Sequence, residues 1–455
     1  MIKLLMNFSE NKENIMSGYD SLLKKIKDKT LKIGVIGLGY VGLPLAVTFA
    51  RNGAKVLGLE KSEKKAIAVN AAKNYIVDVK DSDLINVVKK TKKLEATTDF
   101  SRIKECDAII ICVPTPLDAF KKPDMSFIEN ACHDIGKNMK PGTFISLEST
   151  TYPTTTENLM KPIIEADSGL KEGKDFWLCF SPERVDPGNK DYKTDNTPKV
   201  VGAMGKKAQT LAKGIYSIAI KYLHMVSSPR VAEMVKILEN TYRLINISLI
   251  NELALLSGKM DINIWEVIEA AKTKPYGFQA FYPGPGIGGH CIPLDPFYLE
   301  YIAKEYNFDI SMIHAAGAIN DLMPYRMMSK ISFALNRQKK SMNGSTILFL
   351  GVAYKPDIDD ARESPALLVM EQVAKKGAKV LYHDPYIPSV KDENGKVWKG
   401  VKLTDKLLKE VDCVVFTTNH SCFDVKHIVD IANLVVDTRN AVKDIAIENE
   451  KVFKL

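Results

Sequence analysis

Lys32-Ile-Gly-Val-Ile-Gly-Leu-Gly-Tyr-Val-Gly42 is a short apolar run followed by three spaced glycines. The apolar run predicts a buried strand over 32–36, and the pattern over 41–51 predicts a helix. Between them Gly37 allows a tight turn, Gly39 lets a pyrophosphate approach the backbone, and Gly42 lets helix and strand pack closely. The helix N-terminus offers N–H groups and a partial positive charge to phosphates. We therefore predict a dinucleotide site at Gly37, Leu38, Gly39, Tyr40, Val41 and Gly42.

The second predicted strand, 54–60, ends in a carboxylate, Glu60, 18 residues beyond Gly42. A carboxylate there hydrogen-bonds the adenine-ribose hydroxyls and repels a 2′-phosphate, so NAD is favoured over NADP. Lys61 directly after it weakens that preference slightly. The alternative is a glycine turn that only packs a βα unit.

Later apolar runs continue the pattern. Those at 107–113, 143–147 and 176–180 are separated by helical stretches, which predicts a parallel, doubly wound sheet. At Ser228 a good N-cap residue is followed by proline, which predicts a helix of about 30 residues. Helical patterns at 262–272 and 310–335 follow, so the middle of the chain is expected to be helical.

A second βα series begins at 346. It has a helix to about 376 that Ser364 is expected to cap, and strands at 379–383, 413–417 and 434–437. The stretch 338–343 is the expected linker. The predicted fold class is α/β, with two doubly wound Rossmann-like domains joined by a central helical domain.

Composition excludes several classes of protein. Of the 455 residues, 45% are hydrophobic and 26% are charged, which is ordinary for a folded chain. The sequence has no run of about 18 apolar residues, so we predict no membrane-spanning helix. The start of the chain lacks a secretory pattern, so we expect a cytoplasmic protein. The net charge of +8 is spread along the chain without an arginine-rich run, which argues against nucleic acid. Seven cysteines without a CxxC pair predict neither disulfides nor a metal site.

Cys291 lies in a glycine-proline loop, after Gly288-Gly-His and four residues before Asp295. Small neighbours leave a thiol accessible, and a thiolate is a strong nucleophile toward an aldehyde. Addition gives a thiohemiacetal, hydride loss gives a thioester, and water releases a carboxylate. With a dinucleotide domain upstream, this predicts oxidation of an aldehyde to an acid. The alternative is a packing cysteine.

A polar stripe runs along the long predicted helix. Glu233, Lys236, Asn240 and Arg243 follow one another at steps of three and four, so they share one face. Such a stripe is normally solvated. Because the rest of the helix is apolar over a wide arc, we expect a buried helix whose stripe faces a site, where a buried lysine could stabilise an oxyanion.

The second α/β half begins with Gly351-Val-Ala-Tyr-Lys-Pro-Asp-Ile-Asp-Asp-Ala-Arg-Glu-Ser-Pro365. Lys355 and Arg362 follow a strand, where open α/β sheets bind ligands, and two cations beside a helix N-terminus suit a nucleotide diphosphate. The alternative is a solvated loop with internal salt bridges to its own aspartates.

These motifs occur together in one known family. Gly37–Gly42, Ser181-Pro-Glu-Arg-Val-Asp-Pro-Gly188, the Lys236/Asn240 helix, Gly288–Asp295 and Tyr354–Pro365 have the order found in the UDP-glucose/UDP-mannuronate dehydrogenases. The chain resembles that family over residues 30–450. The Gly-Gly-His-Cys form resembles the branch that acts on UDP-N-acetylhexosamines. Within it, 147–153 and 278–284 most resemble UDP-N-acetylglucosamine 6-dehydrogenases.

The resemblance implies a role for each matching position. It implies catalytic roles for Cys291 as nucleophile, Asp295 at the hydrolytic water, Lys236 and Asn240 at the oxyanion, Thr150 at a water near the sugar C6, and Glu183 in proton transfer. It implies cofactor contacts by Glu60, Lys65, Thr115 and Arg362. It implies substrate contacts by Arg184, Lys236, Asn240, Arg243, Phe281, Tyr282, Gly284, Gly288 and Lys355.

The resemblance also implies an organisation and a reaction. It implies an N-terminal extension (1–30), an NAD-binding domain (31–225), a central dimerisation domain with the cysteine loop (226–337) and a UDP-sugar-binding domain (338–455). A homodimer or higher assembly is expected. The expected reaction oxidises the C6 hydroxyl of the sugar to a carboxylate with two NAD, for polysaccharide or glycan synthesis. Leu294 stands where the UDP-glucose branch often has lysine, which argues against UDP-glucose.

Other functions stay open at this point. UDP-N-acetylmannosamine or UDP-glucose is an alternative substrate. A two-electron 3-hydroxyacid or polyol-phosphate dehydrogenase shares a Rossmann domain followed by helices but needs neither Cys291 nor the second α/β half. A dinucleotide-sensing module needs no catalytic group at all.

Overall fold

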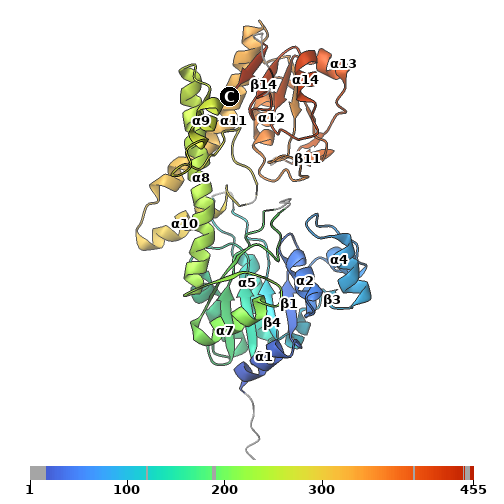
Figure 1. Cartoon of the computed structure of the whole chain (residues 1–455), viewed down its shortest axis with the longest axis vertical. Helices are drawn as coiled ribbons and strands as arrows, with labels where there is room; N and C mark the ends of the chain where they lie inside the picture. The colour runs from blue at the N-terminus through green and yellow to red at the C-terminus, as the bar shows by residue number, and fades with distance from the viewer. Residues whose placement is uncertain are drawn as a thin grey trace, which may run out of the picture. The chain divides into compact units, whose positions relative to one another are not determined.

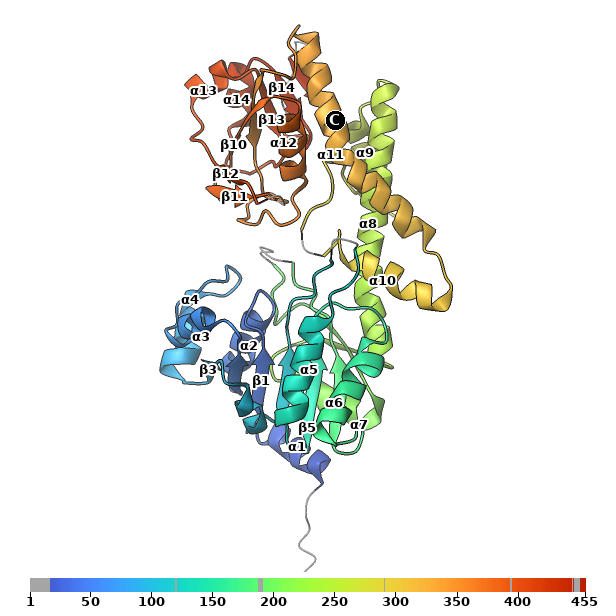
Figure 2. The ribbon, with the colours of Figure 1, turned by 180° about the vertical axis from the view of Figure 1, so that it is seen from behind.

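The computed structural model describes residues 17–118, 121–186, 191–289, 291–392, 395–443, 445 and 451–455 (Figures 1 and 2). The chain divides into two units, residues 1–237 and 238–455. Residues 1–16 of the expected extension, residues 187–190, of which 187 and 188 belong to the Ser181–Gly188 motif, and His290 lie outside the described residues.

The first unit is built on an eight-stranded sheet in the order β3-β2-β1-β4-β5-β6-β7-β8. Its strands are β1 (Lys32–Ile36), β2 (Lys55–Leu59), β3 (Leu94–Thr97), β4 (Ala108–Ile111), β5 (Thr143–Leu147), β6 (Phe176–Phe180), β7 (Lys199–Ala203) and β8 (Leu223–Val226). The strands expected from the apolar runs are confirmed. The five predicted strands pair in parallel as expected, and the sheet continues with β7, which runs antiparallel to β6, and β8, which is parallel to β7.

Helices cover both faces of this sheet, which explains why its strands are apolar throughout. α2 and α7 pack in the core on one face, and α5 and α6 pack on the other. The helices of this unit are α1 (Gly18–Lys27), α2 (Gly42–Arg51), α3 (Glu63–Asn70), α4 (Asp81–Ile85), α5 (Ser126–Asn138), α6 (Lys161–Ser168) and α7 (Gly205–Tyr216). Shorter turns are η1 (Asn86–Lys90), η2 (Phe100–Glu105) and η3 (Thr155–Met160).

α1 precedes the first strand, and it packs on α7. Leu22 is its buried anchor in the sheet core. Lys25 also donates to the buried carboxylate of Asp107 at 2.7 Å. The extension is therefore fastened to the sheet by both apolar and charged contacts.

The helical middle follows the predicted ranges closely. α8 (Pro229–Lys259) starts directly after Ser228, where the sequence predicted a helix start. The helix begins in the first unit and ends in the second. It is followed by α9 (Ile264–Lys272), α10 (Asp295–Ala303), η4 (Lys304–Tyr306) and α11 (Ser311–Arg337). The long loop before α10 carries Cys291.

The second unit contains a parallel five-stranded sheet in the order β10-β9-β13-β14-β15. α11 and α12 pack on one face of it, and α13 and α14 on the other. Figures 1 and 2 both show α11 beside α12. The elements are β9 (Thr346–Leu350), α12 (Pro365–Lys375), β10 (Lys379–His383), β11 (Ser389–Lys391), β12 (Val397–Lys399), α13 (Asp405–Glu410), β13 (Cys413–Phe416), α14 (Val425–Ile431), β14 (Val435–Asp437) and β15 (Val452–Lys454).

The predicted α/β fold class is confirmed, with a sheet in each unit and the long helices between them in sequence. One local detail is wrong. Ser364 stands at the N-cap of α12, but its side chain makes no capping hydrogen bond and its buried hydroxyl has no partner among the described residues.

Candidate active site

The glycine turn of the first unit has the geometry that its sequence predicts. Gly37 has a φ of +87°, a region that favours glycine. A Cβ on Gly42 would lie 1.8 Å from the carbonyl oxygen of Gly37, so only glycine allows this contact. A Cβ on Gly39 would meet nothing within 4 Å, so the space above it is open. The turn therefore has two packing glycines and one glycine that faces free space.

Glu60 lies directly beside this turn and is buried. Its carboxylate accepts hydrogen bonds from the N–H of Leu38 at 2.9 Å and from the N–H of Ser62 at 3.0 Å. The hydroxyl of Tyr75 donates to the carbonyl of Leu38 at 2.8 Å. These bonds hold the turn from both sides. Lys65 lies nearby in sequence, exposed in α3.

The segment after β5 is fastened to α8 by Glu233, a wholly buried carboxylate. Its oxygens accept from the N–H groups of Thr154 at 2.6 Å and Thr156 at 2.9 Å, and from the Thr156 hydroxyl at 2.7 Å. Burial raises the pKa of Glu233 to about 7, against the opposing effect of these bonds. Glu233 thus positions the segment that includes half-buried Thr150.

Lys236 is half-buried, not buried as expected, and it donates to the carbonyl of Glu183 at 2.8 Å. The carboxylate of Glu183 accepts from the backbone N–H groups of Arg184 and Val185, both at 2.8 Å. Arg184 itself donates to the carbonyl of Pro198 at 2.8 Å. Two predicted catalytic residues, Lys236 and Glu183, are therefore in contact.

A buried ion pair lies behind Glu183. Lys199 is 2.5 Å from the carboxylate of Glu148 and 3.8 Å from that of Glu183. Burial raises the pKa of Glu148 to about 7, against the opposing effect of Lys199. Tyr216 donates to Glu148 and lies 2.7 Å from the hydroxyl of Ser146. The Lys199 ammonium thus lies close to two carboxylates, those of Glu148 and Glu183.

In the second unit, Asn240 and Asp295 form a buried pair. The Asn240 amide donates to the Asp295 carboxylate at 2.5 Å, and these residues are 5% and 4% exposed. The backbone N–H of Asp295 donates to the carbonyl of Cys291 at 2.8 Å, at the start of α10. Cys291 itself is only partly exposed. The three residues therefore form one connected group.

The loop before Cys291 is held by close backbone contacts. The N–H of Gly284 donates to the Asn251 side chain at 2.9 Å, and a Cβ on Gly284 would lie 2.3 Å from the guanidinium of Arg439. Gly288 packs on Tyr354, from the loop that carries Lys355. The contact shows that the Gly288 segment and the Lys355 loop lie side by side within this unit.

Aromatic residues flank the loop at 281–284. The rings of Phe281 and Tyr242 meet edge to face at 5.7 Å. Tyr282 stacks on Trp265 and donates to Glu269 at 2.8 Å.

Arg362 is an exposed cation that has an ion-pair partner in its own loop. Its guanidinium pairs with the carboxylate of Asp360 at 2.6 Å, as the salt-bridge alternative for this loop predicted. Lys355 is half-buried, and Arg243 on α8 is exposed. Thr115, the remaining cofactor candidate, is buried in the first unit.

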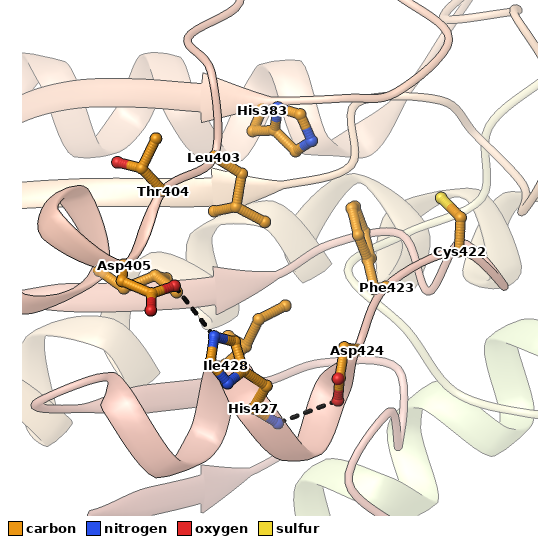
Figure 3. A pocket seen from close by; sticks show the side chains of 10 residues that line it. His383, Leu403, Thr404, Asp405, Cys422, Phe423, Asp424, His427 and Ile428 are labelled. Carbon is orange, nitrogen blue, oxygen red and sulfur yellow. Dashed lines mark hydrogen bonds and ion pairs between the residues drawn. The ribbon is translucent and has the colours of Figure 1, made fainter.

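A hollow of about 240 Å³ opens elsewhere in the second unit (Figure 3). It is lined by His383, Leu403, Thr404, Asp405, Leu408, Cys422, Phe423, Asp424, His427 and Ile428. His427 pairs with Asp405 at 2.9 Å, and the Asp424 carboxylate accepts from the N–H of His427. None of the residues predicted from the sequence as site residues lines it.

Three domain models of one family match the chain. They describe the NAD-binding domain (residues 31–220), the central domain (230–322) and the UDP-binding domain (348–444) of the UDP-glucose/GDP-mannose dehydrogenase family. The chain belongs to this family. Its members are NAD-dependent oxidoreductases, and the resemblance seen in the sequence is confirmed.

Individual relatives span nearly the same length as this dehydrogenase. Protein CapL of Staphylococcus aureus is 37% identical over 89% of this chain and 93% of its own. UDP-N-acetyl-D-glucosamine 6-dehydrogenase of Pseudomonas aeruginosa is 34% identical over 79% and 84%. The solved UDP-N-acetylmannosamine dehydrogenase of Pyrococcus horikoshii has a TM-score of 0.85 at 32% identity, covering 93% of this chain and 99% of its own.

The residues of the dehydrogenase fit NAD at the glycine turn. Open space above Gly39 leaves room for a pyrophosphate, and Glu60 is placed beside the turn. In the described part of the chain no helix is long and apolar enough to cross a membrane. No group of three metal-ligating side chains occurs among the same residues.

Three groups beside the candidate site residues were not predicted from the sequence. The Glu148–Lys199 pair lies in no sequence motif that indicates a site. Glu233 was assigned to the polar stripe, but its hydrogen-bond partners were not predicted. Arg439 follows β14 at the carboxyl edge of the sheet, donates to the Thr417 carbonyl at 3.1 Å and packs on Gly284. Burial lowers the pKa of Arg439 to about 10, so it stays charged at neutral pH. A basic residue directly after a strand was the signal available in the sequence.

Proposed function

We propose that the enzyme oxidises the C6 hydroxyl of a UDP-N-acetylhexosamine to a carboxylate, with UDP-N-acetylglucosamine as the first candidate and UDP-N-acetylmannosamine as the second. The connected group of Cys291, Asp295 and Asn240 carries the proposal, because it joins a partly exposed cysteine through its backbone to a buried carboxylate, and a thiol nucleophile suits acid formation. Named relatives include enzymes for both sugars. The segments 147–153 and 278–284 favour the glucosamine form.

Each oxidation needs a hydride acceptor, and NAD, when bound, takes up one hydride in each of two oxidations. The chain's own residues do the rest. The Cys291 thiolate adds to the C6 aldehyde, and hydride loss from that carbon leaves a thioester. Water then cleaves the C–S bond to give the carboxylate and the free thiol. Asp295 orients this water, and the hydrogen bond from Asn240 holds its carboxylate in place.

The first unit supplies the remaining proposed catalytic groups. Lys236 stabilises the negative charge that develops on the C6 oxygen. Glu183 moves protons between that oxygen and water, and Thr150 holds a water near C6. The hydrogen bond from Lys236 to the Glu183 carbonyl supports placing both groups in one site.

We propose the cofactor and substrate contacts at the positions that the sequence resemblance implies. The turn 37–42, Glu60, Lys65 and Thr115 hold NAD, and Arg362 contacts its pyrophosphate. The substrate is held by Lys355, Arg184, Arg243, Gly288 and the 281–284 segment. Arg439 is added to this set, because its half-buried guanidinium packs on Gly284 and suits an anionic diphosphate.

We also infer a homodimer formed through α8. Its exposed apolar residues include Leu238, Tyr242, Leu249, Leu253 and Leu256. Their spacing of three, four and seven residues places them along one stripe of the helix. An exposed apolar stripe of this kind marks a protein–protein contact. We expect the enzyme in the cytoplasm, where it would supply acidic sugars for polysaccharide synthesis.

The test is an NADH absorbance assay with UDP-N-acetylglucosamine, UDP-N-acetylmannosamine, UDP-N-acetylgalactosamine and UDP-glucose in parallel. We expect two NADH per sugar and the highest kcat/KM with UDP-N-acetylglucosamine. Cys291→Ala should abolish acid formation, while Cys422→Ala, at an exposed cysteine, should not. One NADH per sugar with an active Cys291→Ala variant would show a two-electron dehydrogenase instead.

A further inference from the structure

A buried histidine lies beside the loop that carries Lys355. His420 follows β13, and its side chain is wholly buried. The backbone N–H of Asp357 donates to Nδ1 of His420 at 3.0 Å, and Nε2 lies 3.1 Å from the carboxylate of Asp384. An atom that accepts from an N–H carries no proton of its own. Nδ1 is therefore the acceptor, and the proton on Nε2 is donated to Asp384.

Asp384 is the centre of this arrangement. Besides His420, its carboxylate accepts from the backbone N–H groups of Val352 at 2.7 Å, Ala353 at 3.2 Å, Tyr386 at 2.9 Å and Ile387 at 3.0 Å. Burial by itself raises the pKa of Asp384, but the bonds from His420 and the backbone hold it below its usual value. One ionised carboxylate thus joins the segments that follow β9, β10 and β13.

Further bonds fasten the same loop. The hydroxyls of Thr417 and Thr418 donate to the carbonyls of Gly351 and Ala353. The N–H of Ser421 donates to the Asp357 carboxylate at 2.9 Å. Asp357 has a φ of +62°, so the loop turns sharply two residues after Lys355. His420 holds the backbone at this turn.

We propose that Asp384 and His420 are positioning residues for UDP: they hold the 351–357 backbone so that Lys355 meets the diphosphate. The pair itself does not touch the nucleotide. This proposal rests on the proposed function, which places UDP at that loop. Asp384 fixes the start of the loop, and the Asp357–His420 bond fixes its turn.

Two substitutions separate the bonds of the histidine. His420→Asn places an amide oxygen near the position of Nδ1 and keeps an acceptor for the Asp357 N–H. His420→Gln places an amide N–H near the position of Nε2 and keeps the donor to Asp384, but loses that acceptor. A matched control is His427→Gln, at the exposed histidine that pairs with Asp405 beside the hollow of Figure 3.

The experiment is calorimetric titration of the full chain with UDP, followed by steady-state kinetics. We expect His420→Gln to weaken UDP binding about tenfold, which is the effect of losing one hydrogen bond, here the bond from the Asp357 N–H that fixes the turn. KM for the UDP-sugar should rise by the same factor, with kcat and KM for NAD unchanged. His420→Asn and His427→Gln should bind UDP as the wild type does. If His420→Gln does not fold, Asp384→Asn is measured in its place with the same expectation.

Three results would overturn the proposal. If His420→Gln binds UDP with wild-type affinity, the positioning role of His420 is overturned, but the proposed function is not. A parallel loss of UDP binding, kcat and NAD binding would show a purely structural role. Failure of the wild-type chain to bind UDP would overturn the proposed function, and this proposal with it.

Discussion

The Asn240 amide donates to the Asp295 carboxylate at 2.5 Å, and both side chains are buried. The bond joins α8 to the first residue of α10. Because the Asp295 N–H also bonds the Cys291 carbonyl at 2.8 Å, a shift at Asn240 is transmitted to the backbone of the proposed nucleophile. The position of Cys291 therefore depends on an asparagine 51 residues earlier in the chain.

We expect Asn240→Asp to inactivate the enzyme at neutral pH. Two carboxylates at this distance cannot both ionise when buried, so one takes a proton and Asp295 can no longer orient water as an anion. We expect kcat to fall at least about a hundredfold. The control is Asn246→Asp, because the Asn246 amide bonds the Tyr242 carbonyl of its own helix. Equal kcat in the Asn240 variant and the wild type would contradict the role given to Asp295.

Gly39 and Gly42 should respond to alanine in opposite ways. Gly39→Ala should fold, since its Cβ meets nothing within 4 Å, yet it fills the space expected for the pyrophosphate. We expect KM for NAD to rise about tenfold or more with Tm unchanged. Gly42→Ala should lower Tm, because its Cβ would overlap the Gly37 carbonyl. Thermal unfolding and NAD titration measure both, and normal NAD binding by Gly39→Ala would place the cofactor elsewhere.

Local sequence signals predicted the elements whose conformation depends on residues that are neighbours in the chain. The first strand, its glycine turn and Glu60 were predictable because turn geometry and strand ends follow from neighbouring residue types. The antiparallel β7 was not, since strand direction depends on pairing with β6 across a long connection. Glu233 shows the same limit at the site: its partners, Thr154 and Thr156, lie 79 and 77 residues away. No spacing rule relates a helical glutamate to backbone N–H groups so distant.

Glu233 should make stability fall as pH rises. Burial raises its pKa from 4.5 to about 7, so between these values the unfolded chain loses the proton that the folded chain keeps. The contribution of this group to stability is thus full below about pH 4.5 and is lost as pH rises toward 7. In urea unfolding, the stability of the wild type relative to Glu233→Gln should decrease over this range. A relative stability that increases with pH would show that the carboxylate form is the one favoured by folding.

The apolar stripe on α8 should control the oligomeric state. Leu249→Lys combined with Leu253→Lys places two charges on the proposed contact, and a buried unpaired charge is costly. We expect sedimentation to show a shift from dimer to monomer. The control is Val77→Lys, an exposed apolar residue in the first unit that lies outside the stripe. A monomeric wild type, or a dimeric double variant, would contradict an interface through α8.

The Glu148–Lys199 pair allows stability and catalysis to be tested apart. Lys199→Met leaves the Glu148 carboxyl buried without its cation, and breaking a buried pair costs about 3–5 kcal/mol. Adding Glu148→Gln removes the uncompensated acid and should restore most of that stability, while Tyr216 keeps an acceptor. Catalysis should not return, because Lys199 is also the ammonium 3.8 Å from Glu183. Without that ammonium the carboxylate of Glu183 loses its nearby positive charge, so kcat should stay low in both variants. Recovery of the wild-type kcat together with stability would show that Lys199 acts on folding alone.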